Sequence, residues 1–208
     1  MRRDLRVAVP VLVLGILGQA ACGTPPAPRV DPATLTPDVR IVQSLAIRFG
    51  GRQMLGRGVV VKSGPRLDVF VLAPTGTRLL SVRQDGMHVE ADARLPGLAR
   101  LDPDRLLRDI RWAFFTRCPT SSDPTAATSR CRTRDAEVVE TRDPVSGLVV
   151  SRTFTSGRER VNVTIHPDPT RSPDAPPLRL RMENPKAGYS MDIVLESVEP
   201  APARGDAP

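Results

Sequence analysis

Short runs of alternating apolar and polar residues, separated by turn residues, fill the chain between positions 38 and 199. In the run 44–49, the apolar residues Leu45, Ile47 and Phe49 occupy every second position, which is typical of a strand with one buried face. Turn residues recur about every 8 to 12 positions, which favours antiparallel hairpins over βαβ units. The pattern predicts strands at residues 44–49, 58–62, 67–72, 79–83 and 87–91, and a second group at residues 136–141, 148–155, 160–166, 178–183 and 189–198.

One amphipathic helix is predicted between the two groups of strands. Asp102 is a preferred N-cap residue, Pro103 suits the first helical position, and Asp104 favours the positive end of a helix. An apolar stripe then follows the helical spacing and consists of Leu106, Leu107, Ile110, Ala113 and Phe114. Arg108 and Asp109 lie mostly off this stripe. The stripe gives the predicted sheet an apolar surface to pack against.

The composition indicates one globular domain with two tails. Of the 208 residues, 40% are hydrophobic and 25% are charged, and no apolar run is long enough for a multi-span membrane protein. We predict a single, mainly β domain over residues 38–199. Residues 22–37 are rich in proline and are expected to form an extended tether, and residues 200–208 a polar, disordered tail.

The start of the chain resembles the signal peptide of a bacterial lipoprotein. Residues 1–21 contain several arginines and then an apolar segment too short to cross a membrane comfortably. Ala20-Ala21-Cys22 resembles the lipobox, in which the cysteine thiol is acylated and becomes the new N-terminus. Gln19 departs from the usual aliphatic residue, so ordinary secretion with a free Cys22 stays the alternative. Gly23, where a retention signal would have aspartate, implies sorting to the outer membrane.

The other two cysteines, Cys118 and Cys131, bracket a segment rich in serine, threonine and proline. In the oxidising periplasm that a lipoprotein signal implies, we predict a disulfide bond between them. Acylation of Cys22 would leave these two as a pair, which supports the bond, and two free thiols stay the alternative.

The sequence offers little catalytic or metal-binding chemistry. His88 and His166 are far apart and have no neighbouring ligand at a zinc spacing, so we predict neither a metal nor a cofactor. There is no Gly-x-Ser-x-Gly motif and no phosphate-binding loop, so we do not expect an enzyme. Nearly all of the 30 basic residues are arginine, a bias typical of GC-rich genomes, and we predict no nucleic-acid partner. Trp112 is either packed inside the protein or anchored at a membrane or partner surface.

The order of these elements resembles the LolA/LolB lipoprotein-carrier superfamily over roughly residues 39–198. The resemblance rests on DVFVLAPTGTRLL at 68–80, QDG at 84–86, PDRLLRDI at 103–110 and GYSMDI at 188–193. The chain looks most like an uncharacterised LolB-like branch of outer-membrane lipoproteins. The resemblance implies a mainly β fold, a curved antiparallel half-barrel closed by a helical lid, whose apolar cavity holds acyl chains.

This resemblance implies which side chains would line the cavity, because aliphatic walls suit acyl chains. On the helix they are Leu106, Leu107, Ile110 and Phe114. On the sheet they are Leu45, Ile47, Phe49, Phe70, Leu72 and Leu80. The alternative is a solid core built from the same residues.

A turn at Pro74, Thr75 and Gly76 matches a LolB turn that projects a leucine and helps to deliver the lipoprotein to the membrane. Thr75 stands in the place of that leucine and would bury much less apolar area in lipid. Insertion of lipoproteins is therefore in doubt, whereas binding of another lipid-like cargo is compatible with this turn.

We therefore expect a non-enzymatic outer-membrane lipoprotein, anchored through Cys22 on the periplasmic face, that binds or hands over an acylated or otherwise hydrophobic molecule. The alternative is a lipid-anchored structural or interaction protein with a solid core and a protein partner in the cell envelope. An envelope hydrolase with unrecognised catalytic residues is a third, weaker hypothesis.

Replacing Cys22 by serine is expected to release the protein from membranes, because the variant lacks the thiol that receives the acyl chains. Each buried methylene contributes about 0.8 kcal/mol, so several chains anchor firmly. Cell fractionation and immunoblotting of the membrane pellet check this, with Cys118→Ser as the control that stays in the pellet. Unchanged membrane retention of Cys22→Ser would contradict the anchor.

Overall fold

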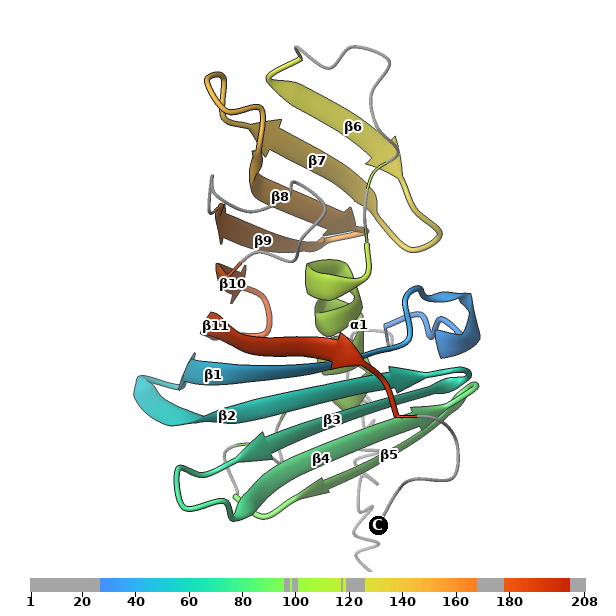
Figure 1. Ribbon diagram of the computed structural model, residues 1–208, viewed down its shortest axis with the longest axis vertical. Helices are drawn as coiled ribbons and strands as arrows, with labels where there is room; N and C mark the ends of the chain where they lie inside the picture. Colours follow the sequence, from blue (N-terminus) through green and yellow to red (C-terminus); the bar gives the residue numbers. More distant parts are fainter. Residues whose placement is uncertain are drawn as a thin grey trace, which may run out of the picture.

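The computed structural model describes residues 27–95, 98, 101–116, 118, 126–167 and 178–202. The predicted signal peptide, Cys22 and residues 203–208 of the predicted tail lie outside these residues. In the described part, 11 strands form one open antiparallel sheet in the order β5-β4-β3-β2-β1-β11-β10-β9-β8-β7-β6 (Figure 1). The predicted mainly β fold is confirmed, with one open sheet and one short α-helix.

The elements follow the predicted order of strands, helix and strands. They are η1 (Pro32–Thr34), β1 (Val39–Phe49), β2 (Arg52–Ser63), β3 (Arg66–Leu72), β4 (Arg78–Asp85), β5 (His88–Ala93), α1 (Pro103–Phe114), β6 (Thr128–Arg132), β7 (Glu137–Arg142), β8 (Val149–Ser156), β9 (Glu159–His166), β10 (Arg179–Asn184) and β11 (Tyr189–Pro200). The first and last strands, β1 and β11, pair in the middle of the sheet. This long-range pairing joins the two predicted groups of strands into one sheet.

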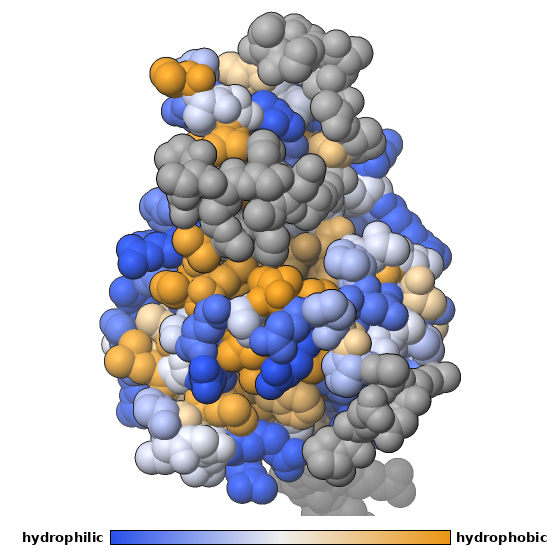
Figure 2. Space-filling view, in the orientation of Figure 1, coloured by the Kyte–Doolittle hydropathy of each residue, from blue (hydrophilic) through white to orange (hydrophobic). Residues whose placement is uncertain are grey.

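The core lies between the sheet and α1, which Figure 1 places between the two halves of the sheet. Figure 2 shows hydrophobic residues gathered in the middle of the molecule, with hydrophilic residues around and between them. Among the described residues, no helix is long and apolar enough to span a membrane.

Two strands begin earlier than predicted. β1 starts at Val39 and β2 at Arg52, ahead of the apolar runs that predicted them. Ion pairs across the strands stabilise the outer face of the sheet, as Arg57 of β2 reaches over β1 to pair with Glu196 of β11. β6 was missed altogether because its sequence, Thr-Ser-Arg-Cys-Arg, has no apolar alternation.

Residues 27–37, which we expected in an extended tether, pack against the domain instead. Ala27 and Pro32 are buried, and Asp31 caps the short helix η1. The guanidinium of Arg29 donates to both carboxylate oxygens of Asp104 (2.8 and 3.1 Å) and to the carbonyl of Met87 (3.0 Å). These contacts, together with the buried Ala27 and Pro32, place the segment on the domain.

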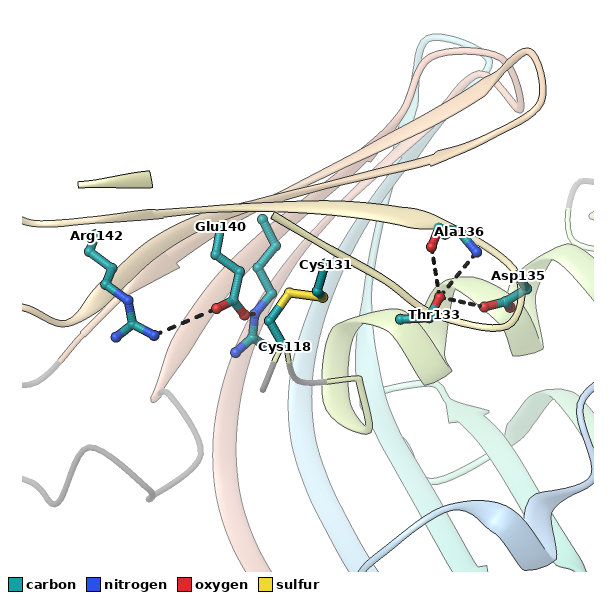
Figure 3. The surroundings of a disulfide bond; sticks show 8 residues. Cys118, Cys131, Thr133, Asp135, Ala136, Glu140 and Arg142 are labelled. Atoms are coloured by element: carbon teal, nitrogen blue, oxygen red, sulfur yellow. Dashed lines mark hydrogen bonds and ion pairs between the residues drawn. A yellow bond between two sulfur atoms is a disulfide. The ribbon is translucent and has the colours of Figure 1, made fainter. Parts of the chain in front are cut away.

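The predicted disulfide bond between Cys118 and Cys131 is present (Figure 3). Cys118 follows α1, and Cys131 lies on the edge strand β6, with the two Cα atoms 5.7 Å apart. The bond therefore ties the end of the helical segment to a strand that has a partner on one side.

Reduction of this bond is expected to lower the free energy of unfolding by about 3 kcal/mol, because it frees a loop of this size in the unfolded chain. Thermal melting with and without reductant checks this in a Cys22→Ser background. The double variant Cys118→Ala/Cys131→Ala serves as the control and should not respond to reductant. Equal melting temperatures of the parent protein in both conditions would contradict a stabilising bond.

Candidate functional site

The helix α1 is buried on all sides between the halves of the sheet. Every residue from Leu106 to Ala113 is buried, including Arg108, Asp109 and Arg111. Its apolar stripe faces β1–β4 and β11, whereas Arg108 contacts Glu159 of β9 and Asp109 contacts Tyr189 at the start of β11. The helix thus has one apolar and one polar contact surface within the same protein.

An apolar cavity of about 30 Å³ lies under the apolar side of α1. Most of the residues around it have apolar side chains, and the exceptions are Gln43, Gly58 and Tyr189. The lining residues are Gln43, Leu45, Ile47, Gly58, Val69, Phe70, Val71, Leu80, Leu101, Leu106, Ile110, Phe114, Tyr189, Met191 and Ile193. We call this space the inner cavity.

A second apolar space of about 180 Å³ adjoins the inner cavity and is more open to the surface. Leu80, Leu101 and Leu106 border both spaces. The remaining walls of this outer pocket come from Val82, Ala91, Ala93, Leu98 and Pro103. The two spaces therefore share part of their walls, and both lie beside the apolar side of α1.

Most of the predicted lining residues lie together around the inner cavity. These are Leu45, Ile47, Phe70, Leu80, Leu106, Ile110 and Phe114. Leu107 is buried in the core but borders neither space. Phe49 lies at an open groove between the hairpin turns that follow β1 and β10.

Leu72 was assigned to the lining on the strength of the resemblance, and it ends the almost continuously apolar run 67–72. Strand pairing shows the inward side of β3, since Val69 pairs with Val60 and Val71 pairs with Leu80. Successive residues of a strand face opposite sides, so Phe70 and Leu72 are both on the outward side and half-buried, although Phe70 still borders the inner cavity. Sequence alternation could not resolve this, because both sides of the strand carry apolar residues.

The polar side of α1 centres on a buried network around Asp109. Arg108 donates to Oδ1 of Asp109 through Nε (3.0 Å) and Nη2 (2.8 Å), and it also pairs with Glu159 of β9. Oδ2 of Asp109 accepts from Nδ2 of Asn184 (2.8 Å) and from the hydroxyl of Tyr189. These contacts fix α1 to β9, β10 and β11.

Burial governs the electrostatics of this network. Desolvation raises the pKa of Asp109, against the stabilising charge of Arg108 and the hydrogen bonds to its carboxylate. Burial also raises the pKa of Tyr189 well above its ordinary value, and the neighbouring Asp109 adds to the shift. Burial disfavours the charged form of Arg108 and lowers its pKa. The carboxylates of Asp109 and Glu159 favour the charged form more strongly, so the pKa of this guanidinium is raised overall. Each buried charge of this network, on Arg108 and on Asp109, therefore has hydrogen-bonding partners within the protein.

Trp112 extends the polar side of α1 toward β7 and β8. Its ring stacks on Phe154 with centroids 5.1 Å apart, and the guanidinium of Arg108 lies 4.5 Å from its centroid. Its indole nitrogen donates to Asp135 (3.2 Å). Trp112 is therefore packed inside the protein, the first of the two roles that the sequence left open.

The turn at Pro74, Thr75 and Gly76 connects β3 to β4 and is exposed. The amide of Gly76, which has a positive φ of 84°, donates to the carbonyl of Ala73 (2.8 Å). The hydroxyls of Thr75 and Thr77 lie 3.3 Å apart, so the tip of the turn is polar. Within the described residues, no group of three or more histidine, cysteine, aspartate or glutamate side chains is placed to hold a metal ion.

Asp109→Asn is expected to lower the free energy of unfolding by about 3 kcal/mol, because it removes one partner of a buried ion pair. Urea denaturation followed by circular dichroism measures the change. Asp92→Asn is the matched control, since Asp92 pairs with Arg78 at the surface, and it should shift stability by less than about 0.5 kcal/mol. Equal effects of the two substitutions would contradict an anchoring role for Asp109.

Comparisons with known proteins show the family of this chain. No curated protein matches the sequence. A DUF1329 family protein from Desulfovibrio piger has 11% identity and a TM-score of 0.44, covering 84% of this chain and 89% of its own. A putative outer membrane lipoprotein-sorting protein domain from Vibrio parahaemolyticus has 9% identity and a TM-score of 0.37, covering 77% and 84%. The family model described as "Protein of unknown function (DUF3261)" matches residues 40–197, and the chain therefore belongs to this family.

Proposed function

We propose that the protein binds the aliphatic tail of an acylated or other lipid-like molecule between α1 and the β1–β4 half of the sheet. The observation that carries this proposal is the pair of apolar spaces beside α1, the outer pocket and the inner cavity, whose walls share Leu80, Leu101 and Leu106. Apolar walls bind a hydrocarbon chain by excluding water and by non-directional contacts. No catalytic step is part of this proposal.

The size of the two spaces limits what enters without rearrangement. Pockets that enclose a whole small ligand measure about 300–1,000 Å³. The outer pocket, at about 180 Å³, is smaller and suits the end of one tail. Deeper entry requires α1 to move away from β1–β4.

The contacts of α1 favour movement on this side. The helix is tied to β9, β10 and β11 by the Asp109 network, but it meets the inner cavity through apolar side chains. An entering tail would replace these apolar contacts with contacts of the same kind. Arg29 links Asp104 at the start of α1 to Met87, and its partial exposure makes this a weak restraint of about 0–1 kcal/mol.

The proposed setting is the periplasmic face of the outer membrane, with Cys22 as the lipid anchor. A bound tail would leave the protein by partition into the bilayer, which buries it more completely. The polar tip at Thr75 favours binding and transfer of a hydrophobic cargo over insertion of lipoproteins.

A second candidate function is that of a lipid-anchored interaction protein with a solid core and an envelope protein partner. The small size of the inner cavity favours this second function, because a space of about 30 Å³ holds no more than one or two water molecules. The two functions differ in whether a hydrocarbon chain enters the protein.

Leu80→Trp is expected to weaken the binding of a fluorescent fatty acid at least tenfold, because Leu80 borders both apolar spaces and the indole would fill them. Fluorescence titration of the full chain carrying Cys22→Ser measures the dissociation constant. Native mass spectrometry of the same protein reports any co-purified lipid.

Leu79→Trp is the matched control, since the neighbouring Leu79 borders neither space and should leave binding within about twofold. Overpacking costs about 1–3 kcal/mol, so thermal melting must show that both variants are folded. If the parent protein binds no fatty acid and carries no lipid, the carrier proposal fails and the solid-core function is favoured.

A further inference from the structure

One polar side chain, Gln43 of β1, lies in the apolar wall of the inner cavity. It is 4% exposed and pairs in the sheet with Gly58 of β2 and Leu195 of β11. Gln43, Leu45 and Ile47 are two positions apart along β1, so they share one face of the strand, and all three line the cavity. The amide is therefore on the inward side of the sheet, under α1.

The side-chain oxygen of Gln43 is buried and has no hydrogen-bond partner among the residues that the structure describes. A buried acceptor without a donor destabilises the fold, and most such groups in proteins are paired. A leucine of similar size would fill the same position without this cost. The oxygen is thus a feature of the cavity wall that packing alone does not explain.

Gly58 makes room for this amide. A Cβ atom at position 58 would lie 2.8 Å from Nε2 of Gln43 and 2.7 Å from Cδ1 of Leu45. The backbone of Gly58 does not have a positive φ, so its conformation does not require glycine. Space for the two neighbouring side chains is the physical reason for glycine here.

A water molecule would satisfy Gln43 poorly. Buried waters make about three hydrogen bonds, whereas the side chains around this amide are apolar apart from Tyr189. The hydroxyl of Tyr189 already donates to Asp109. A polar group carried on a hydrocarbon chain fits this wall better, because the rest of the molecule contacts the apolar side chains.

We infer that the bound tail carries a hydroxyl group that pairs with the side-chain amide of Gln43. A hydroxyl both donates and accepts, so it can donate to the oxygen and accept from the nitrogen of the amide. This inference rests on the proposed function and narrows its cargo to hydroxylated aliphatic chains. Gln43 then selects among lipids, and the apolar walls supply most of the affinity.

The test compares tetradecanoic acid with monohydroxylated tetradecanoic acids that carry the hydroxyl near the carboxyl end, in the middle or at the far end. Each acid displaces a fluorescent fatty acid from the full chain carrying Cys22→Ser. At least one hydroxylated acid is expected to bind about 3- to 10-fold more tightly than the plain acid, as one net hydrogen bond predicts. Gln43→Leu should remove this preference and bind the plain acid at least as well as the parent protein.

Gly58→Ala provides a second variant, because its Cβ would displace the side-chain amide of Gln43. It should reduce the preference for hydroxylated acids without adding or removing a polar group. A plain acid that binds as tightly as every hydroxylated acid would overturn this inference and leave the proposed function standing. A preference that persists in Gln43→Leu would also overturn it. If none of the acids binds to the parent protein, the proposed function fails and the inference fails with it.

Discussion

The structure depends on the burial of a single short helix inside one curved sheet. A helix enclosed on all sides must find partners for its polar side chains as well as for its apolar ones, because an unpaired buried charge is costly. In α1 the charged side is matched by Glu159, Asn184 and Tyr189 from the second half of the sheet. The apolar side packs on β1–β4 and on Met191 and Ile193 of β11, around the inner cavity. The division of α1 into two surfaces sets both how the helix is held and where a ligand could enter.

Because of this division, α1 is held firmly on its polar side and by replaceable apolar contacts on the side of the proposed cargo site. Hydrogen bonds and ion pairs are directional, so the Asp109 network holds α1 in one orientation against β9–β11. Contacts around Leu106 and Ile110 are apolar and tolerate replacement by another hydrocarbon. The outer pocket opens on this apolar side of α1, next to β4 and β5. In this wall Gln43 has a buried oxygen without a hydrogen-bond partner among the described residues, and for that reason it is the residue that we assign to cargo selection.

The sequence predicted the architecture well because alternation and turn spacing are local signals. The inward residues Leu45, Ile47 and Leu80, and the capped helix with its stripe, could be identified from their neighbours alone. The inward side of β3 could not be read from the sequence, because Phe70 and Leu72 on one side and Val69 and Val71 on the other are all apolar. Gln43 was missed because the predicted strand began one residue later, although it continues the alternation of Leu45 and Ile47. The buried network was missed because Asp109 is 75 residues from Asn184 and 80 from Tyr189, and no local pattern links them.

The most direct measurement of the central claim is the position of a bound tail. Nuclear Overhauser contacts between the methylenes of tetradecanoic acid and methyl groups of the protein would locate it. The account predicts contacts to Leu80 and Ile110, on opposite walls of the inner cavity, and none to Phe154 on the polar side of α1. Contacts confined to outward-facing residues such as Val194 of β11, or contacts to neither Leu80 nor Ile110, would contradict it.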